Sequence, residues 1–178
     1  MSQQLVVTIL GADKFGMLSA IVDTVCDVGC NILDSRQAVF GQDFSLTMII
    51  EGSQAAIANA EFAIPHTCHK LELLCLLKRT KRHNKQNLEH IADIIIKGEN
   101  ANGVIKKITS FFAQFTISVS AFRLKTSKNS DQLSMGPEQM TCKMVVSIPH
   151  SISVEEVESA FQNLLLALNL QGSIKQNH

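Results

Sequence analysis

A loop bracketed by two glycines, Gly11-Ala-Asp-Lys-Phe-Gly16, follows an apolar run and leads into a segment with helical spacing. Its outline matches the start of a phosphate-binding loop, but Met17 and Leu18 stand where that motif needs Lys and Ser or Thr. The loop is therefore not a nucleotide cradle. The first N–H groups of a helix are unpaired and carry a partial positive charge, so the amides of residues 15–18 suit a small anion such as a carboxylate.

Two interpretations of this loop remain open. In the first, the loop binds a free amino acid: its amides hold the carboxylate, and Asp13 or the carbonyls near Asn31 hold the ammonium group. In the second, Asp13 only caps the helix and Gly16 only lets the helix pack, because glycine tolerates unusual dihedral angles.

The sequence evidence for a metal site or a catalytic site is weaker. The cluster His66-Thr-Cys-His69, with Cys75 or His83 beyond it, fits neither paired C-x₂-C motifs nor an H-E-x-x-H helix, so we predict no metal site. No Cys, Ser or carboxylate stands in a recognisable catalytic pattern. We therefore expect no catalytic residues and no enzyme activity.

The most basic stretch of the chain contains Lys78, Arg79, Lys81, Arg82 and Lys85. RNA-reading sheets need aromatic residues for base stacking, whereas this chain has no Trp, no Tyr and no matching motif. Lys plus Arg equals Asp plus Glu at 16 each, so no overall charge draws the protein to DNA. We interpret the stretch as a solvated linker and expect no direct nucleic-acid binding.

Cysteine use and hydropathy indicate the compartment. The five cysteines are an odd number, and no charged-then-apolar leader follows Met1, which argues against a secreted disulfide framework. We expect Cys26 and Cys30 to be core thiols. The apolar run of residues 71–77 is far shorter than the roughly 18 residues of a membrane helix. The sequence predicts a soluble, cytoplasmic protein with no membrane association.

The chain repeats itself with a shift of 87 residues, which places Gly11 on Gly98 and Gly16 on Gly103. Apolar positions coincide at the same shift. The matched pairs are Val7 with Ile94, Ile9 with Ile96, Met17 with Val104, Leu18 with Ile105, Ile21 with Ile108, Val25 with Phe112 and Val28 with Phe115. The same buried helix face is therefore described twice, which indicates two copies of one fold.

Each copy is expected to run strand, helix, strand, strand, helix, strand. The first copy has strands at 5–10, 31–39, 43–50 and 70–78, a helix at 17–28, and a short Ala-rich helix that ends before Pro65. The second has strands at 92–97, 117–125, 141–148 and 172–175, a helix at 103–115, and a helix opened by a capping box, Ser153-Val-Glu-Glu156. A mobile connection is expected at 128–138.

This order predicts an α+β fold made of two ferredoxin-like βαββαβ domains, each an antiparallel sheet with both helices on one face. We place the N-terminal domain at residues 1–80, the linker at 81–87 and the C-terminal domain at 88–178.

The loop Gly11–Gly16, followed by Gly29-Cys-Asn-Ile32 and Asp34-Ser-Arg36, resembles the ACT domains, whose first loop typically reads Asp-Arg-Pro-Gly. Two such copies, with the late Gln171-Gly-Ser-Ile174, resemble the glycine cleavage system transcriptional repressor family. Lys14 and Phe15 replace the usual Arg-Pro, so a rigid proline is missing. Asn100 stands at the position that matches Asp13.

The resemblance implies a regulator that senses a small amino acid, with glycine expected, needs no cofactor, and represses by contacting a DNA-binding transcriptional activator. It places the ligand between the first loop of one domain and the second strand of a neighbouring domain. The implied binding residues are Ala12, Asp13, Lys14, Phe15, Gly16, Met17, Leu18, Asn31 and Ile32. A possible second site holds Asn100, Asn102, Gly103 and Val104. Sheet edges favour a homodimer.

Two alternatives remain. The run Gly29-Cys-Asn-Ile32 with Asp34 and Gln37 also looks like the N-terminal ACT domain of formyltetrahydrofolate deformylases. The other alternative is a protein-interaction module that binds no ligand.

Overall fold

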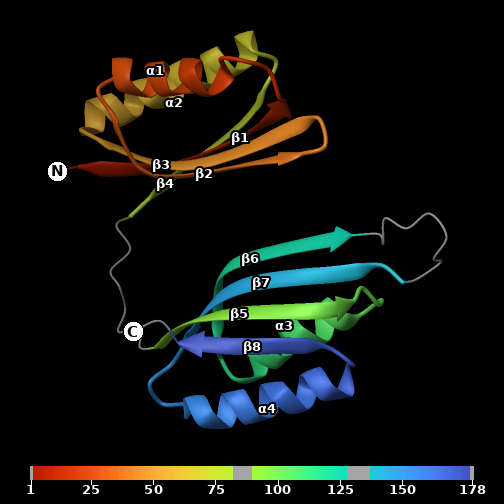
Figure 1. The fold of residues 1–178 in the computed structure, drawn as a ribbon. Coiled ribbons are helices and arrows are strands. Elements are labelled where there is room, and N and C mark those ends of the chain that lie inside the picture. Colours follow the sequence, from red (N-terminus) through yellow and green to blue (C-terminus); the bar gives the residue numbers. More distant parts are fainter. Residues whose placement is uncertain (1, 82–89, 128–136, 177–178) are drawn as a thin grey trace. The chain divides into compact units, whose positions relative to one another are not determined.

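The computed structural model describes residues 2–81, 90–127 and 137–176 and divides into two compact units, Met1–Asn84 and Lys85–His178. The first unit contains β1 (Gln3–Ala12), α1 (Met17–Asp27), β2 (Asn31–Phe40), β3 (Asp43–Gly52), α2 (Gln54–Lys70) and β4 (Leu74–Thr80). The second contains β5 (His90–Glu99), α3 (Val104–Gln114), β6 (Ser118–Ser127), β7 (Gln139–Ile148), α4 (Val154–Ala167) and β8 (Gln171–Gln176) (Figure 1). The predicted linker at 81–87 and most of the predicted connection at 128–138 lie outside the described residues.

Each unit is built on a four-stranded antiparallel sheet. The strand orders are β2-β3-β1-β4 and β6-β7-β5-β8, so the first strand of each unit lies inside its sheet and the second strand lies at an edge. In the first unit, α1 and α2 lie together over one face of the sheet (Figure 1). The predicted α+β fold with two ferredoxin-like βαββαβ units is confirmed.

One face of each sheet is apolar and buried beneath the helices. In the first unit Leu5, Val7 and Ile9 alternate along β1 and are fully buried, while Met17 and Val25 of α1 point toward them. Period-2 burial on the strands and burial at every fourth helix position are the patterns that two packed layers require. The second core repeats the arrangement, and its largest fully buried side chains are Phe112, Phe161 and Ile94.

The 87-residue repeat is visible in the element bounds. β1, α1 and β2 shifted by 87 residues give the bounds of β5, α3 and β6, and both edge strands β2 and β6 carry a register shift, at Ile32/Asp34 and Val119/Ala121. The shift changes after β6, because the β6–β7 connection is longer than the two-residue turn at Gly41-Gln42. The two units are therefore copies that differ in this hairpin connection and in their second helix, which has 17 residues in α2 and 14 in α4.

The predicted end of the second helix before Pro65 is wrong. α2 passes through Pro65 and ends at Lys70. Proline removes the N–H that would bond to the carbonyl of Glu61, which normally breaks a helix. Here Ile64 and Cys68, on either side of the proline, are both buried in the core, and this packing holds the helix together across the missing bond.

The prediction that Cys26 and Cys30 are core thiols is half right. Cys30 is buried, and burial raises the pKa of its thiol. Cys26 is exposed, because the buried positions of α1 are Met17, Ile21 and Val25 and the residue after Val25 turns toward solvent. None of the described helices is long and apolar enough to cross a membrane.

Candidate functional site

The start of α1 is free of side-chain capping. Gly16 is the N-cap residue, adopts the left-handed conformation with φ of 82°, and no side chain accepts a hydrogen bond there. The interpretation of Asp13 as the helix cap is therefore wrong. The first-turn N–H groups have no side-chain acceptor, and they lie at the positive end of the helix dipole.

The loop before α1 is fixed from two sides. The backbone N–H of Asp13 donates to the carbonyl of Gln42 in the β2–β3 turn, at 2.9 Å. The Lys14 ammonium donates to a carboxylate oxygen of Glu72 after α2, at 3.1 Å. The Lys14–Glu72 pair is exposed and adds little stability, but both contacts restrict where the loop can lie.

A hollow of about 310 Å³ lies against this loop. Its lining residues are Asp13, Lys14, Phe15, Gly16, Met17, Leu18, Ser19, Gln37 and Phe44. Six of the predicted site residues, 13–18, therefore lie together around one space. Four side chains of the lining can hydrogen-bond or carry charge, namely those of Asp13, Lys14, Ser19 and Gln37, and buried Phe44 adds an apolar surface.

Gln37 and Phe44 line this site although neither was predicted to belong to it. Both come from the β2–β3 hairpin, where Gln37 pairs with Leu46 and Phe44 pairs with Gly11 and Val39. The helix-side row of edge strand β2 carries polar residues at Ser35 and Gln37, opposite buried Met48 and Leu46. Polar residues on the helix side of this strand were the available signal.

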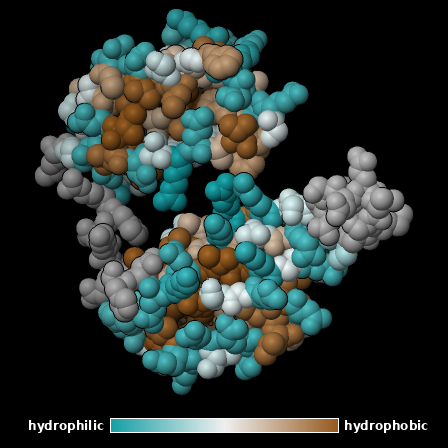
Figure 2. Space-filling model, in the orientation of Figure 1, coloured by the Kyte–Doolittle hydropathy of each residue, from teal (hydrophilic) through white to brown (hydrophobic). Residues whose placement is uncertain are grey.

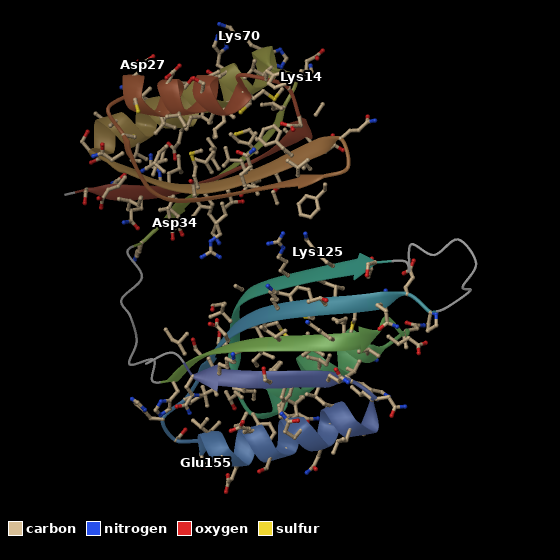
Figure 3. All side chains as sticks on the ribbon, in the orientation of Figure 1. Lys14, Asp27, Asp34, Lys70, Lys125 and Glu155 are labelled. Carbon is tan, nitrogen blue, oxygen red and sulfur yellow. The ribbon has the colours of Figure 1, made fainter. Side chains whose placement is uncertain are left out.

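Asn31 and Ile32 lie at the other end of the unit. Asn31 pairs with Glu51, whereas Ala12, at the end of β1, pairs with Asp43 at the opposite end of β3. Lys14 and Asp27 stand at opposite ends of α1 (Figure 3). The structure thus does not bring Asn31 and Ile32 to the loop within one unit, and their predicted role requires a neighbouring domain.

The second loop has the same backbone but different side chains. Gly103 is the uncapped N-cap of α3 with φ of 84°, and the N–H of Asn100 donates to the carbonyl of Glu138 at 2.8 Å. Val104 begins the helix and is buried, and Asn102 is exposed where Phe15 stands in the first loop. The positions of Asp13 and Gln37 are taken by Asn100 and Leu124, so the second loop lacks the carboxylate and the strand amide.

The described His, Cys, Asp and Glu side chains do not cluster as metal ligands would. Within residues 2–81, 90–127 and 137–176, no group of three or more His, Cys, Asp or Glu side chains is arranged to hold a metal ion. His66 and His69 are exposed on α2, whereas Cys68 is buried. Cys68 hydrogen-bonds to Cys75, which raises the pKa of Cys68 and lowers the pKa of Cys75.

A larger hollow of about 500 Å³ lies between the start of β1 and the end of β4. Its main cation, Arg79, is already bound: it donates to Glu61 at 2.7 and 2.8 Å and to Gln3 at 3.1 Å. We therefore do not assign the ligand site to this hollow.

Comparison with known proteins defines the class first. The ACT domain family model matches residues 3–77, which span the first unit from β1 into β4. The first unit is thus similar to ACT domains over most of its length, and the second unit repeats its topology.

Two curated proteins match nearly the whole chain. The chain is 29% identical over 170 residues to the glycine cleavage system transcriptional repressor of Escherichia coli, which covers 96% of this chain and 88% of the relative, and the Shigella flexneri protein matches equally. A crystal structure assigned to a glycine cleavage system transcriptional repressor has a TM-score of 0.75 at 29% identity and covers 99% of this chain and 98% of its own. The chain is thus similar to these repressors over nearly its whole length, as its residues predicted.

A further solved structure shows the fold alone. A protein of unknown function from Galdieria sulphuraria has a TM-score of 0.80 at 15% identity, with full coverage of both chains.

Proposed function

We propose that this chain is an amino-acid-sensing regulatory protein, with glycine as its effector, that represses transcription indirectly by binding a DNA-binding activator of the glycine cleavage operon. The observation that carries the proposal is the similarity to the glycine cleavage system transcriptional repressor of Escherichia coli, which extends over 96% of the chain and so includes both units. That extent favours a regulator over the deformylase alternative, whose resemblance rests on the first unit.

The loop of the first unit supports an amino-acid ligand. In this proposal the carboxylate of glycine accepts hydrogen bonds from the first-turn amides of Met17 and Leu18, where the helix dipole favours an anion. The ammonium group donates to Asp13 and to the side-chain oxygen of Gln37, which line the same hollow. A ligand without a side chain suits a small open hollow that Phe15 and Phe44 partly line.

The neighbouring domain completes the site in this proposal. Asn31 and Ile32 begin edge strand β2 of the first unit, so the first unit of a second copy of the chain, in a homodimer, can present them to the first loop. Ligand bound between two domain surfaces favours one packing of those domains, and the activator distinguishes the two packings by affinity.

We further propose that the protein is not an enzyme, uses no cofactor, does not bind nucleic acid directly and works in the cytoplasm. Its five cysteines are all free thiols, which is in keeping with a reducing compartment.

Calorimetric titration with glycine, then with other amino acids, tests the proposal. Saturable heat should appear with the full chain and should be lost in Asp13→Ala and Gly16→Val. Asp23→Ala, which removes an exposed carboxylate of α1 outside the hollow, is the control and should bind as the wild type does. No heat from any amino acid would leave an ACT scaffold that acts by protein contact alone, and heat unchanged in both variants would place the site elsewhere.

A further inference from the structure

The sheet face of the second unit that no helix covers has more cations than carboxylates among its described residues. Asp93 and Glu99 of β5 lie on this face, with Asp93 opposite Lys175. The cations of the face are Lys97 from β5, Arg123 and Lys125 from β6, Lys143 from β7 and Lys175 from β8. Lys125 projects from the sheet on the side away from the helices (Figure 3). Hydrophilic side chains gather on the β6 side of this unit (Figure 2). We call these five residues the basic face.

The strand register brings four of these cations close together. Arg123 is directly opposite Lys143, and Lys125 and Lys97 both flank Thr141. Arg123, Lys125, Thr141 and Lys143 line a shallow hollow of about 130 Å³. Like charges directly opposite one another on paired strands destabilise a sheet, so this arrangement costs folding free energy.

The fold itself does not need three of these charges. In the first unit, which has the same topology, the positions matching Lys97, Lys125 and Lys143 are Leu10, Ala38 and Thr47, whereas those matching Arg123 and Lys175 are Arg36 and Lys78. Among the described residues, no ion pair joins Arg123, Lys125 or Lys143 to a carboxylate. Arg123, Lys125 and Lys143, which form no ion pair with the described carboxylates, are suited to an external anionic partner.

The side chains between the cations favour a protein over a nucleic acid. Ile95, Ala121 and Val145 are half-buried on the same face and form an apolar centre beside the charges. None of the sheet positions that face away from the core in β5–β8 is aromatic within the described residues, so bases have no stacking platform. An apolar centre with a charged rim is the usual anatomy of a protein interface.

We infer that the basic face is the docking site for an acidic segment of a protein partner. This inference rests on the proposed function in one respect, that the chain acts through a protein. It assigns the partner surface to the second unit and the effector loop to the first.

A binding assay with defined probes tests this assignment. The full chain is titrated, by fluorescence anisotropy, into a labelled Glu-rich peptide with interspersed apolar residues, and separately into single-stranded and duplex DNA of equal net charge. Arg123→Glu/Lys143→Glu is compared with Lys106→Glu/Lys107→Glu, which makes the same charge change at exposed positions of α3. Circular dichroism checks that both variants are folded.

The expected result is that the peptide binds, that the basic-face variant weakens binding by about tenfold or more, and that the α3 variant binds within about twofold of the wild type. Equal loss in both variants, or no peptide binding at all, would overturn the inference. Tighter binding of DNA than of the peptide, lost in the same variant, would replace the protein partner with nucleic acid. Glycine calorimetry on the basic-face variant separates the two proposals, because the effector site should remain intact there.

Discussion

Gly16 and Gly103 adopt the same left-handed conformation, with φ of 82° and 84°, as N-cap residues of the helices that follow β1 and β5. An added Cβ at either glycine would meet nothing within 4 Å, so steric crowding does not explain why glycine stands at these two positions. The backbone conformation does, because L-residues other than Asn and Asp rarely adopt it. The shared loop geometry is thus a property of the fold, and ligand selectivity must come from the side chains that differ.

Replacement of Gly16 tests the conformational argument. Gly16→Ala should lower the free energy of unfolding by about 1 kcal/mol, because Ala is strained in the left-handed region. Gly16→Asn should lose less, since Asn tolerates that region better. Urea unfolding followed by circular dichroism measures both variants. If both variants lower the free energy of unfolding equally, the left-handed conformation is not the reason why glycine stands at position 16.

Gln37→Leu gives the first unit the residue that the second unit carries at the matching position, Leu124. We expect glycine affinity to fall by about tenfold, because the ammonium group loses a hydrogen-bond acceptor. Stability should change little, since Gln37 is exposed on an edge strand. Calorimetry measures the affinity, and Ser35→Ala on the same strand is the control. Unchanged affinity would remove Gln37 from the site.

The ion pair between Glu61 and Arg79 predicts a pH effect on stability. Its two hydrogen bonds, at 2.7 and 2.8 Å, lower the pKa of the Glu61 carboxyl below its ordinary value of 4.5. A lowered folded-state pKa adds stability above pH 4.5, and this contribution is lost as the pH falls through the folded-state value. Glu61→Gln should therefore lower the Tm near pH 7 by a small amount, because the pair is at the surface.

The difference in Tm between Glu61→Gln and the wild type should shrink as the pH falls below 4.5. Glu158→Gln, at an exposed position of α4, serves as the control. A difference that stays constant down to the acid transition would contradict the assigned role of the ion pair.

The hydrogen bond between Cys68 and Cys75 predicts selective alkylation of Cys75. Cys75 accepts a hydrogen bond from Cys68, which lowers the pKa of Cys75, whereas burial raises the pKa of Cys142. Iodoacetamide should therefore modify Cys75 before Cys142 and Cys68, as read by mass spectrometry of peptides. Cys68→Ala should slow the reaction of Cys75 several-fold, while Cys68→Ser keeps a donor and should slow it less. Equal rates in the two variants would show that the hydrogen bond does not set the reactivity.

Pro65→Ala should stabilise the first unit. The new N–H can bond to the carbonyl of Glu61, and the helix gains about 3 kcal/mol in intrinsic propensity, offset by about 1 kcal/mol of added freedom in the unfolded chain. A net gain of about 2 kcal/mol in unfolding free energy is expected from urea titration. Pro149→Ala, outside the helices, is the control. A loss of stability would mean that the proline fits α2 without cost.

Much of the fold could be predicted from the sequence because the first three elements of each unit repeat with a single shift of 87 residues. Matching glycines and apolar positions at one shift located β1, α1 and β2 together with β5, α3 and β6. The end of α2 was missed because core packing of Ile64 and Cys68 outweighs the local effect of Pro65. Such packing is a tertiary property that no local signal near residue 65 contains.

The candidate site was predicted only where it is contiguous in sequence. Residues 13–18 line one hollow, as a glycine-bracketed loop before a helix suggests. Gln37 and Phe44 join that hollow through the register of β2 and β3, which one sequence does not specify. The role of Asn31 and Ile32 depends on a second domain, so it stays a prediction.

The most direct test of amino-acid sensing is an NMR titration of the ¹⁵N-labelled full chain with glycine, which reports on each backbone amide. The account predicts saturable shifts concentrated at residues 14–19 and at Gln37, with smaller changes at the matching loop, residues 101–106. Absence of saturable shifts, or shifts confined to residues outside the first loop and its hairpin, would contradict it.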